Sequence, residues 1–81
     1  MPQQPEIDVP AHLMPGVRLQ HYKGGLYRVE GACLIEATLE TGILYRPEQG
    51  NATHLLWMRP AAAFDELVDT DRGQVPRFAP V

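Results

Sequence analysis

The sequence has no serine and a single cysteine, Cys33. A lone cysteine cannot close an intramolecular disulfide, so the chain is not a disulfide scaffold. Without serine, nucleophilic catalysis by a Ser-His-Asp triad is excluded. No apolar run approaches the roughly 20 residues that a membrane-spanning helix needs, and residues 1–15 lack the basic start and apolar stretch of a signal peptide. We therefore expect a soluble, cytoplasmic protein.

Aromatic residues are scarce, at 7% of the 81 residues, and the seven basic residues are outnumbered by ten acidic ones. A net charge of −3 does not suit a general polyanion binder, because such affinity comes from Lys and Arg neutralising phosphates. A local basic patch is compatible with this balance, since charges need not be mixed evenly. The length fits one small domain, and a domain this short leaves little free energy for a strained catalytic site.

Metal-binding patterns are also missing. His12, His21 and His54 stand far apart, and there is no Cys-x-x-Cys or His-x-x-x-His pair, so we expect no metal and no cofactor. Cys33 falls among the apolar positions of a predicted strand, where burial makes a thiol inert. The acidic residues form two groups that we interpret as solvated, although the second would also suit a basic partner. The groups are Glu36 with Glu40, and Asp65 and Glu66 with Asp69 and Asp71.

Prolines concentrate near the N-terminal end of the sequence. Residues 1–15 hold half of the eight prolines, and proline fixes φ and lacks a backbone donor. We interpret residues 1–15 as a proline-rich flexible arm, either a disordered tail or a peptide that docks on the domain or on a partner. Residues 16–81 then form a single small β-barrel domain.

The first part of this domain has the pattern of a β-hairpin. Val17–Lys23 and the run that begins at Leu26 are separated by Gly24-Gly25, and glycine reaches the positive φ of a hairpin turn without strain. From Leu26 to Glu40 the odd positions are apolar and the even positions mostly polar. This alternation predicts a strand whose odd face covers the core, with a bend near Gly31 or a turn near residues 37–41.

Two strands and a helix are predicted next. The third strand is Ile43–Arg46, and His54–Arg59 is the fourth. Because this fourth strand is apolar on both faces, we expect it to be buried on both sides or to twist through a barrel corner. Pro60 suits the first position of a helix over Ala61–Leu67, in which Phe64, Leu67 and Val68 have the spacing of one buried stripe.

The last predicted element is a short edge strand, Val75–Phe78, because Pro76 is tolerated only at a sheet edge. The elements then amount to four or five short antiparallel strands and one short helix. They predict a mostly β fold, a small SH3-like barrel, with an OB-like barrel as the second choice.

The most suggestive functional pattern combines aromatic residues with basic ones. The combinations are Tyr22 with Lys23, Tyr45 with Arg46, Trp57 with Arg59, and Phe78 with Arg77. Rings beside cations serve stacking and phosphate contact in single-strand binders, and they equally fill the core and rim of a small barrel. Strand alternation places neighbours on opposite faces and residues two apart on the same face. The candidate binding residues are His21, Lys23, Tyr45, Arg46, Trp57 and Arg59.

The stretch from Val17 to Phe78 also carries short motifs that are specific in combination. They are His21-Tyr22-Lys23-Gly24-Gly25, Tyr27, Val29, Gly31, Thr38-Leu39-Glu40, Ile43-Leu44-Tyr45-Arg46, Trp57-Met58-Arg59-Pro60, Phe64 and Val75-Pro76-Arg77-Phe78. With these motifs the chain resembles the domain-of-unknown-function 1653 family of small bacterial domains, which implies a compact, mostly β, SH3-like domain. It departs from the family pattern at two places. Ile35-Glu36-Ala37 replaces the usual His-Ser-Glu-like stretch, and Ala62-Ala63 replaces the usual Glu-Met pair.

Three classes of function follow from these features. The first is a non-enzymatic module that recognises a protein or peptide partner through an aromatic platform flanked by cations. The alternative is nucleic-acid or nucleotide binding through the same face, against which the net acidity argues. The third is a small enzyme with His21 as its base, for which the sequence holds no catalytic constellation. Homodimer formation through a strand edge is compatible with all three.

Overall fold

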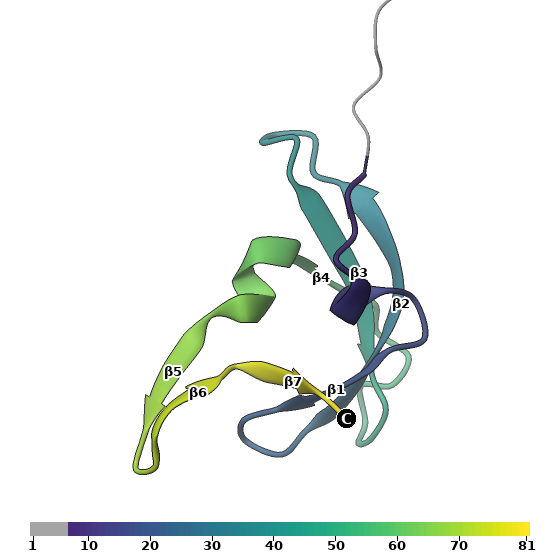
Figure 1. Ribbon diagram of the computed structural model, residues 1–81. Coiled ribbons are helices and arrows are strands. Elements are labelled where there is room, and N and C mark those ends of the chain that lie inside the picture. Colours follow the sequence, from purple (N-terminus) through teal and green to yellow (C-terminus); the bar gives the residue numbers. More distant parts are fainter. Residues whose placement is uncertain (1–6) are drawn as a thin grey trace, which may run out of the picture.

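The computed structural model describes residues 7–81, which form seven strands and two short 3-10 helices. A five-stranded antiparallel sheet has the order β4-β3-β2-β1-β7, and β5 with β6 makes a separate hairpin to one side of it (Figure 1). Neither helix in these residues is long or apolar enough to span a membrane. The elements are η1 (Ala11–Leu13), β1 (Arg18–His21), β2 (Leu26–Leu34), β3 (Thr41–Pro47), β4 (Trp57–Pro60), η2 (Ala61–Asp65), β5 (Leu67–Thr70), β6 (Gly73–Pro76) and β7 (Phe78–Pro80).

The predicted hairpin at Gly24-Gly25 is confirmed as the connection between β1 and β2. The Gly24 N–H donates to the His21 carbonyl at 2.7 Å, and the His21 N–H donates to the Gly25 carbonyl at 2.8 Å. Of the two glycines only Gly24 has a positive φ, 105°. The loop is therefore a three-residue turn that uses Gly24 at its left-handed position.

A β-bulge near Gly31 divides β2 into two halves. Val29 pairs with Tyr45 but Gly31 pairs with Leu44, so the register shifts by one residue between them. The predicted bend near Gly31 is thus confirmed, and a slip of one residue exchanges the two faces beyond it. Ala32 packs against the core in place of Cys33. The prediction that Cys33 lies on the core face is wrong for this reason.

Strand β4 is an edge strand, which corrects the prediction of a strand buried on both sides or at a barrel corner. Within residues 7–81 its only partner is β3, through pairs such as Tyr45 with Trp57 and Leu44 with Met58. The side chains of Leu55, Leu56, Trp57 and Met58 are 40–51% exposed. Apolar residues on both faces therefore reflect an uncovered edge in this strand. The strand begins at Trp57 instead of the predicted His54.

The predicted helix over Ala61–Leu67 is shorter than expected. It is a 3-10 helix that ends at Asp65, and Pro60 precedes it with extended backbone (ψ 138°) instead of occupying its first position. Phe64 is buried as predicted, but Leu67 is 59% exposed and begins β5. The apolar stripe of the helix is thus reduced to one core residue.

The C-terminal part contains three strands where one was expected. β6 pairs with β5, and after Arg77 the chain returns to the main sheet as β7, where Phe78 pairs with His21. The count of four or five strands is therefore wrong, because a local hairpin and a separate edge strand replace the single strand Val75–Phe78. The second acidic group, Asp65 to Asp71, is exposed as predicted.

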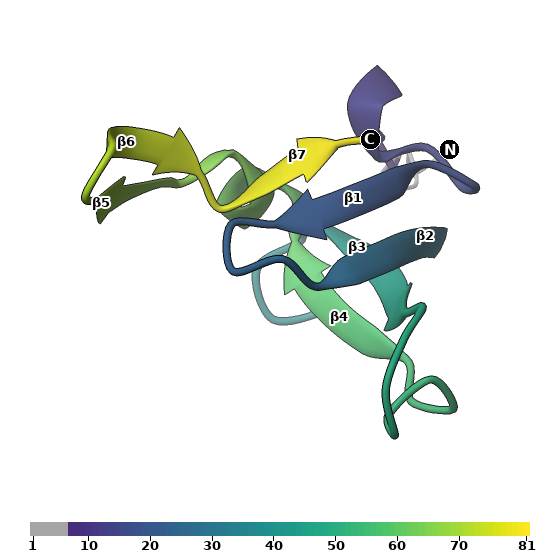
Figure 2. The same ribbon diagram turned by 90° about the horizontal axis from the view of Figure 1, so that it is seen from below.

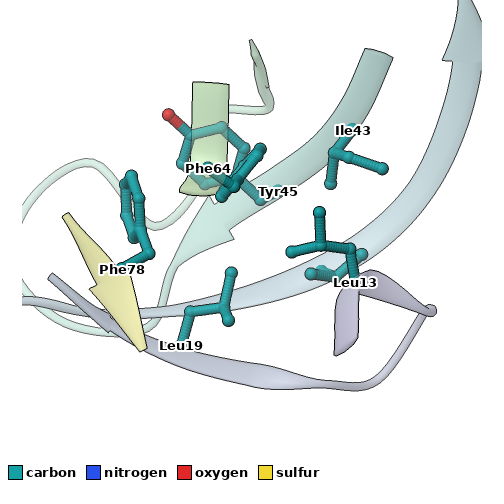
Figure 3. Close-up of a cluster of buried hydrophobic side chains, with 7 residues drawn as sticks. Leu13, Leu19, Ile43, Tyr45, Phe64 and Phe78 are labelled. Atoms are coloured by element: carbon teal, nitrogen blue, oxygen red, sulfur yellow. The ribbon is translucent and has the colours of Figure 1, made fainter. Parts of the chain in front are cut away.

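The core lies on the inner face of the curved sheet, under η1 and η2. Leu13 and Ile43 lie at one end of it, and Tyr45, Phe64 and Phe78 gather at the other (Figure 3). The full set of buried residues is Leu13, Leu19, Val29, Ile43, Tyr45, Phe64 and Phe78.

The described portion of the proline-rich arm, residues 7–15, contributes to this core. Leu13 in η1 is 1% exposed, and Val9 packs against the buried cluster. His12 Nε2 also lies 3.0 Å from Asp65 Oδ1 at the end of η2. Residues 1–6 of the predicted arm lie outside the described residues.

The five-stranded sheet is open, with β4 and β7 as its outermost strands (Figure 2). A closed barrel is therefore not seen, although the fold is mostly β and antiparallel as predicted. Side chains connect the two edges: the Arg59 guanidinium from β4 lies over the Phe78 ring of β7, with Cζ 5.5 Å from the ring centroid. Phe64 of η2 packs in the same place, 5.0 Å from Phe78 between ring centroids.

Gly42 on β3 has no room for a side chain. A Cβ at this position would lie 2.7 Å from Cys33 Sγ and 3.0 Å from Met58 Sδ. We expect Gly42→Ala to lower the free energy of unfolding by about 1–3 kcal/mol because of this overpacking, as measured by urea denaturation. Adding Cys33→Ala should recover most of the loss. Gly31→Ala is the control, since its Cβ would meet only Leu44 Cδ1 at 3.9 Å; an equal loss in both alanine variants would contradict this account.

The buried Leu13 allows a test of how firmly η1 is part of the fold. Leu13→Ala should lower the free energy of unfolding by about 2–4 kcal/mol, because it removes a fully buried side chain. Its neighbour Met14 is 47% exposed, so Met14→Ala should change stability by less than about 0.5 kcal/mol. Thermal and urea unfolding of the two variants would show the contrast, and similar stabilities would mean that η1 is not packed on the sheet in solution.

Candidate functional site

The six candidate binding residues lie in different parts of the molecule. Arg46 lies on the outer face of the sheet, Tyr45 lies in the core and Trp57 lies at the free edge of β4. The other three, His21, Lys23 and Arg59, lie around the end of β1. The structure therefore separates the predicted aromatic and basic face into several surfaces.

Arg46 belongs to a cluster of ion pairs on the outer face. Arg18, Arg28 and Arg46 stand opposite one another on β1, β2 and β3. Glu30 lies 3.2 Å from Arg28 and 3.4 Å from Arg46, and Glu48 accepts a hydrogen bond of 2.8 Å from Arg18. The hydrogen bond from Arg18 lowers the pKa of Glu48. Each arginine in this row has a carboxylate partner, but Arg28 and Arg46 share Glu30, so one positive charge of the row is unmatched.

Tyr45 and Trp57 are cross-strand neighbours with different surroundings. Tyr45 is 7% exposed, and its ring meets those of Phe64 and Phe78 edge to face at 5.2 and 5.8 Å. Trp57, opposite it on the edge strand, is 47% exposed. Tyr45 therefore serves the core, while Trp57 offers an accessible indole.

Four basic residues lie around the end of β1, where the charges of three of them act on the fourth, His21. We call them the basic cluster, which consists of His21, Lys23, Arg59 and Arg77. The rings of His21 and Phe78 meet edge to face at 5.0 Å, because the two residues pair across β1 and β7. Arg59 approaches the same ring from β4, and Arg77 directly precedes it in sequence. The open, curved sheet thus places residues of β1, β4 and the β6–β7 connection near one another.

The hydrogen bond to His21 defines its protonation state. The backbone N–H of Lys23 donates to His21 Nδ1 at 3.2 Å. An imidazole nitrogen that accepts a hydrogen bond carries no proton, so the ring is neutral with its proton on Nε2. Partial burial lowers the pKa of His21, and the charges of Arg77, Lys23 and Arg59 lower it further. The ring therefore offers Nε2–H as a donor in a positively charged environment.

The two arginines of the basic cluster have hydrogen-bonding capacity that residues 7–81 do not use. In both Arg59 and Arg77 the Nε atom is buried and has no hydrogen-bond partner. Arg77 Nε lies 3.4 Å from Glu66 Oε2 and so has a charge partner. Arg59 forms no ion pair with any carboxylate in the described part of the chain. Like Lys23, Arg59 therefore carries a charge that no carboxylate of residues 7–81 pairs with.

A cleft of about 680 Å³ opens beside His21, between the β1–β2 loop and the β5–β6 hairpin. His21 and Tyr22 line one wall, and Asp69, Asp71 and Arg72 line the other. The charges that perturb the pKa of His21 are nevertheless all cations. The charged residues that line the cleft itself, Asp69, Asp71 and Arg72, therefore all lie on the hairpin side, while Lys23, Arg59 and Arg77 lie outside its lining.

Arg77 belongs to the basic cluster but was not among the six candidate binding residues. Its signal was present in the sequence, because Arg77 and Phe78 form one of the aromatic and basic combinations. Within residues 7–81, no three His, Cys, Asp or Glu side chains come together as the ligands of a metal ion would.

Comparison with known proteins identifies the family. The family model described as "Protein of unknown function (DUF1653)" matches residues 18–80, most of the chain. The chain belongs to the DUF1653 family. The crystal structure of a DUF1653 protein from Bordetella bronchiseptica is similar, with 36% sequence identity over 83% of this chain and 85% of that chain and a TM-score of 0.71. No curated protein matches the sequence.

The resemblance inferred from the short motifs is thereby confirmed. The DUF1653 match includes the whole basic cluster and every strand, whereas Leu13 precedes it. The two segments at which the resemblance implies departures from the family pattern lie in the turn after β2, at residues 35–37, and within η2, at residues 62–63. Both lie outside the basic cluster.

The lowered pKa of His21 predicts how the stability of this DUF1653 domain depends on pH. The unfolded chain takes up a proton near the ordinary histidine pKa of about 6.5, while the folded chain resists protonation to lower pH. His21 therefore contributes stability that is present above that pH and is lost as pH falls toward its folded pKa. His21→Gln should reduce the pH dependence of unfolding free energy between about pH 7.5 and pH 5.5, because glutamine does not titrate.

The exposed His54 provides the control for this measurement, since His54→Gln should keep the pH dependence of the parent chain. Urea unfolding at several pH values would compare the three proteins. Parallel curves for His21→Gln and the parent would contradict the assignment of this pH dependence to His21.

Proposed function

We propose that this DUF1653 domain is a non-enzymatic binding module that takes up an extended segment of a protein partner along the free edge of β4. One observation carries the proposal. Leu55, Leu56, Trp57 and Met58 are successive apolar residues, and each is 40–51% exposed at this edge. Soluble domains rarely leave contiguous large apolar side chains uncovered unless a partner covers them.

The backbone of β4 adds a second contribution. Its β3 side is paired along Trp57–Pro60, while no strand of residues 7–81 pairs with its other side. Unpaired N–H and C=O groups at a sheet edge are a template for another strand, and proteins commonly protect such edges with charge or proline. Here Arg59 and Pro60 protect the second half of the strand, while Trp57 and Met58 leave its first half open. A partner strand would find main-chain hydrogen bonds beside apolar contacts, as in peptide recognition by strand addition.

The two faces of β4 would give such a partner different contacts. Met58 lies opposite Leu44, and Trp57 lies opposite Tyr45 on the face that bears the core. A bound strand alternates its side chains between these faces. Trp57 is the residue type most often found at the energetic centre of an interface, so it is the expected anchor. Arg59, two residues along on the same face, would suit an acidic group of the partner.

Two finer expectations from the sequence belong to the same proposal. One is that the curved sheet is of the SH3-like kind, whose members include peptide-binding modules. The other is a cytoplasmic location, where Cys33 would remain a free thiol.

The proposal is tested by selecting extended peptides from a display library against the whole chain and mapping them on it. A selected peptide should shift the amide NMR signals of β4 and change the fluorescence of Trp57, the single tryptophan. Met58→Lys should weaken binding about tenfold or more, because it places a charge in the apolar contact.

Leu67→Lys is the matched control, since Leu67 is 59% exposed on β5, outside the main sheet, and its change should leave affinity within about twofold. Peptides that shift only other surfaces would contradict the proposal. So would sedimentation showing a dimer that Met58→Lys dissociates, because a second copy of the chain would then occupy this edge.

A further inference from the structure

The basic cluster has an excess of positive charge that the described chain does not neutralise. Lys23, Arg59 and Arg77 each carry a positive charge, and Glu66 beside Arg77 is the one carboxylate of residues 7–81 in an ion pair with any of them. His21 is neutral, since its Nδ1 accepts the Lys23 hydrogen bond. The cluster thus holds three cations and one anion, with Arg59 over the Phe78 ring, Lys23 Nζ 5.7 Å from the Tyr22 centroid and Arg77 beside Glu66. Its unmatched charge equals that of a dianion.

The donors of the cluster are also held in place before any ligand arrives. The Arg59 guanidinium lies over two rings, with Cζ 5.5 Å from the Phe78 centroid and 6.0 Å from the Phe64 centroid. Its buried Nε has no acceptor. A guanidinium fixed in this way loses little side-chain entropy on binding, and its planar fork matches an oxyanion. His21 Nε2–H is a second donor next to the same ring, because the Lys23 hydrogen bond orients the imidazole.

We propose that the basic cluster binds the phosphoryl group of a small ligand, either inorganic phosphate or a phosphate monoester. A phosphate monoester carries a charge of about −1.5 to −2 at neutral pH and three acceptor oxygens, which suits two unmatched cations and several donors. A single carboxylate would leave one positive charge unmatched. This inference goes beyond the proposed function, because it concerns a different ligand and the residues around His21; Arg59 of β4 is the one residue that the two proposals share.

The surroundings of the cluster favour a small ligand over a nucleic acid. Asp69 and Asp71 line the far wall of the cleft beside His21, and they would repel a second phosphate there. The chain as a whole carries a net charge of −3. Long polyanions gain affinity from many phosphate contacts along a basic surface, and this surface offers one such position.

The test is an NMR titration of the whole chain with inorganic phosphate, with a nucleoside 5′-monophosphate and with acetate, at low ionic strength. Phosphate should produce saturable shifts of the His21 ring and of the Arg59 Nε–H signal. It should also raise the pKa of His21, because it neutralises the cations that lower it. A monophosphate that binds more tightly than phosphate identifies an ester as the ligand, and equal affinities identify the free ion.

Variants connect these shifts to the cluster. Arg59→Gln should weaken phosphate binding about tenfold or more. Since Arg59 also packs on Phe64 and Phe78, Lys23→Gln at an exposed loop position is a second variant, and it should weaken binding without affecting the fold. Arg28→Gln on the outer face removes the same charge elsewhere and should change affinity less than about twofold.

Three results would overturn the inference. One is the absence of saturable shifts at His21 and Arg59 with either phosphate ligand. Another is acetate binding as tightly as phosphate, because the site would then recognise a single carboxylate. The third is an equal effect of Arg28→Gln and Lys23→Gln, which would show only screening of the net charge. Phosphate titration reports on the basic cluster and Met58→Lys reports on the apolar contacts of the β4 edge, so failure of one proposal is distinguishable from failure of the other.

Discussion

The packing of Phe78 against Phe64 and Tyr45 is the contact on which the arrangement of this molecule depends. These three rings come from β7, η2 and β3, and every pair of them lies within 6 Å between centroids. Aromatic pairs of this kind contribute about 0.5–1.5 kcal/mol each beyond their buried area. They keep an open sheet curved, because they connect its last strand to its interior. The position of Arg59 over Phe78 follows from this curvature, and so does the basic cluster.

Much of the fold could be predicted from local pattern, and the exceptions have identifiable causes. The hairpin at Gly24 and the bend at Gly31 were accessible because glycine has conformational freedom that other residues lack. The exchange of faces after the bend could not be predicted. An inserted residue leaves the alternation of apolar and polar residues intact, but it reverses which of them face the core. The exposure of β4 was also hidden, because apolar residues on both faces are typical of a buried strand.

The candidate sites show the same division between local and tertiary information. Alternation alone placed Trp57 and Arg59 on one face and separated Tyr45 from Arg46, as the pairing of β3 with β4 shows. No local pattern indicates that Arg59 meets Phe78, since these residues belong to strands at opposite edges of the sheet. That proximity depends on how far the sheet curves, which is a property of the whole core.

The burial of Leu13 affects how the domain would respond to proteolysis. This side chain precedes the region shared with the family, yet it fills one end of the core beside Ile43 (Figure 3). Cleavage by a protease between Leu13 and Arg18 would separate it from the sheet and leave an apolar hollow at that end. The cut chain would then unfold more readily and expose further bonds to cleavage. A single nick in this short segment would thus determine the lifetime of the whole domain.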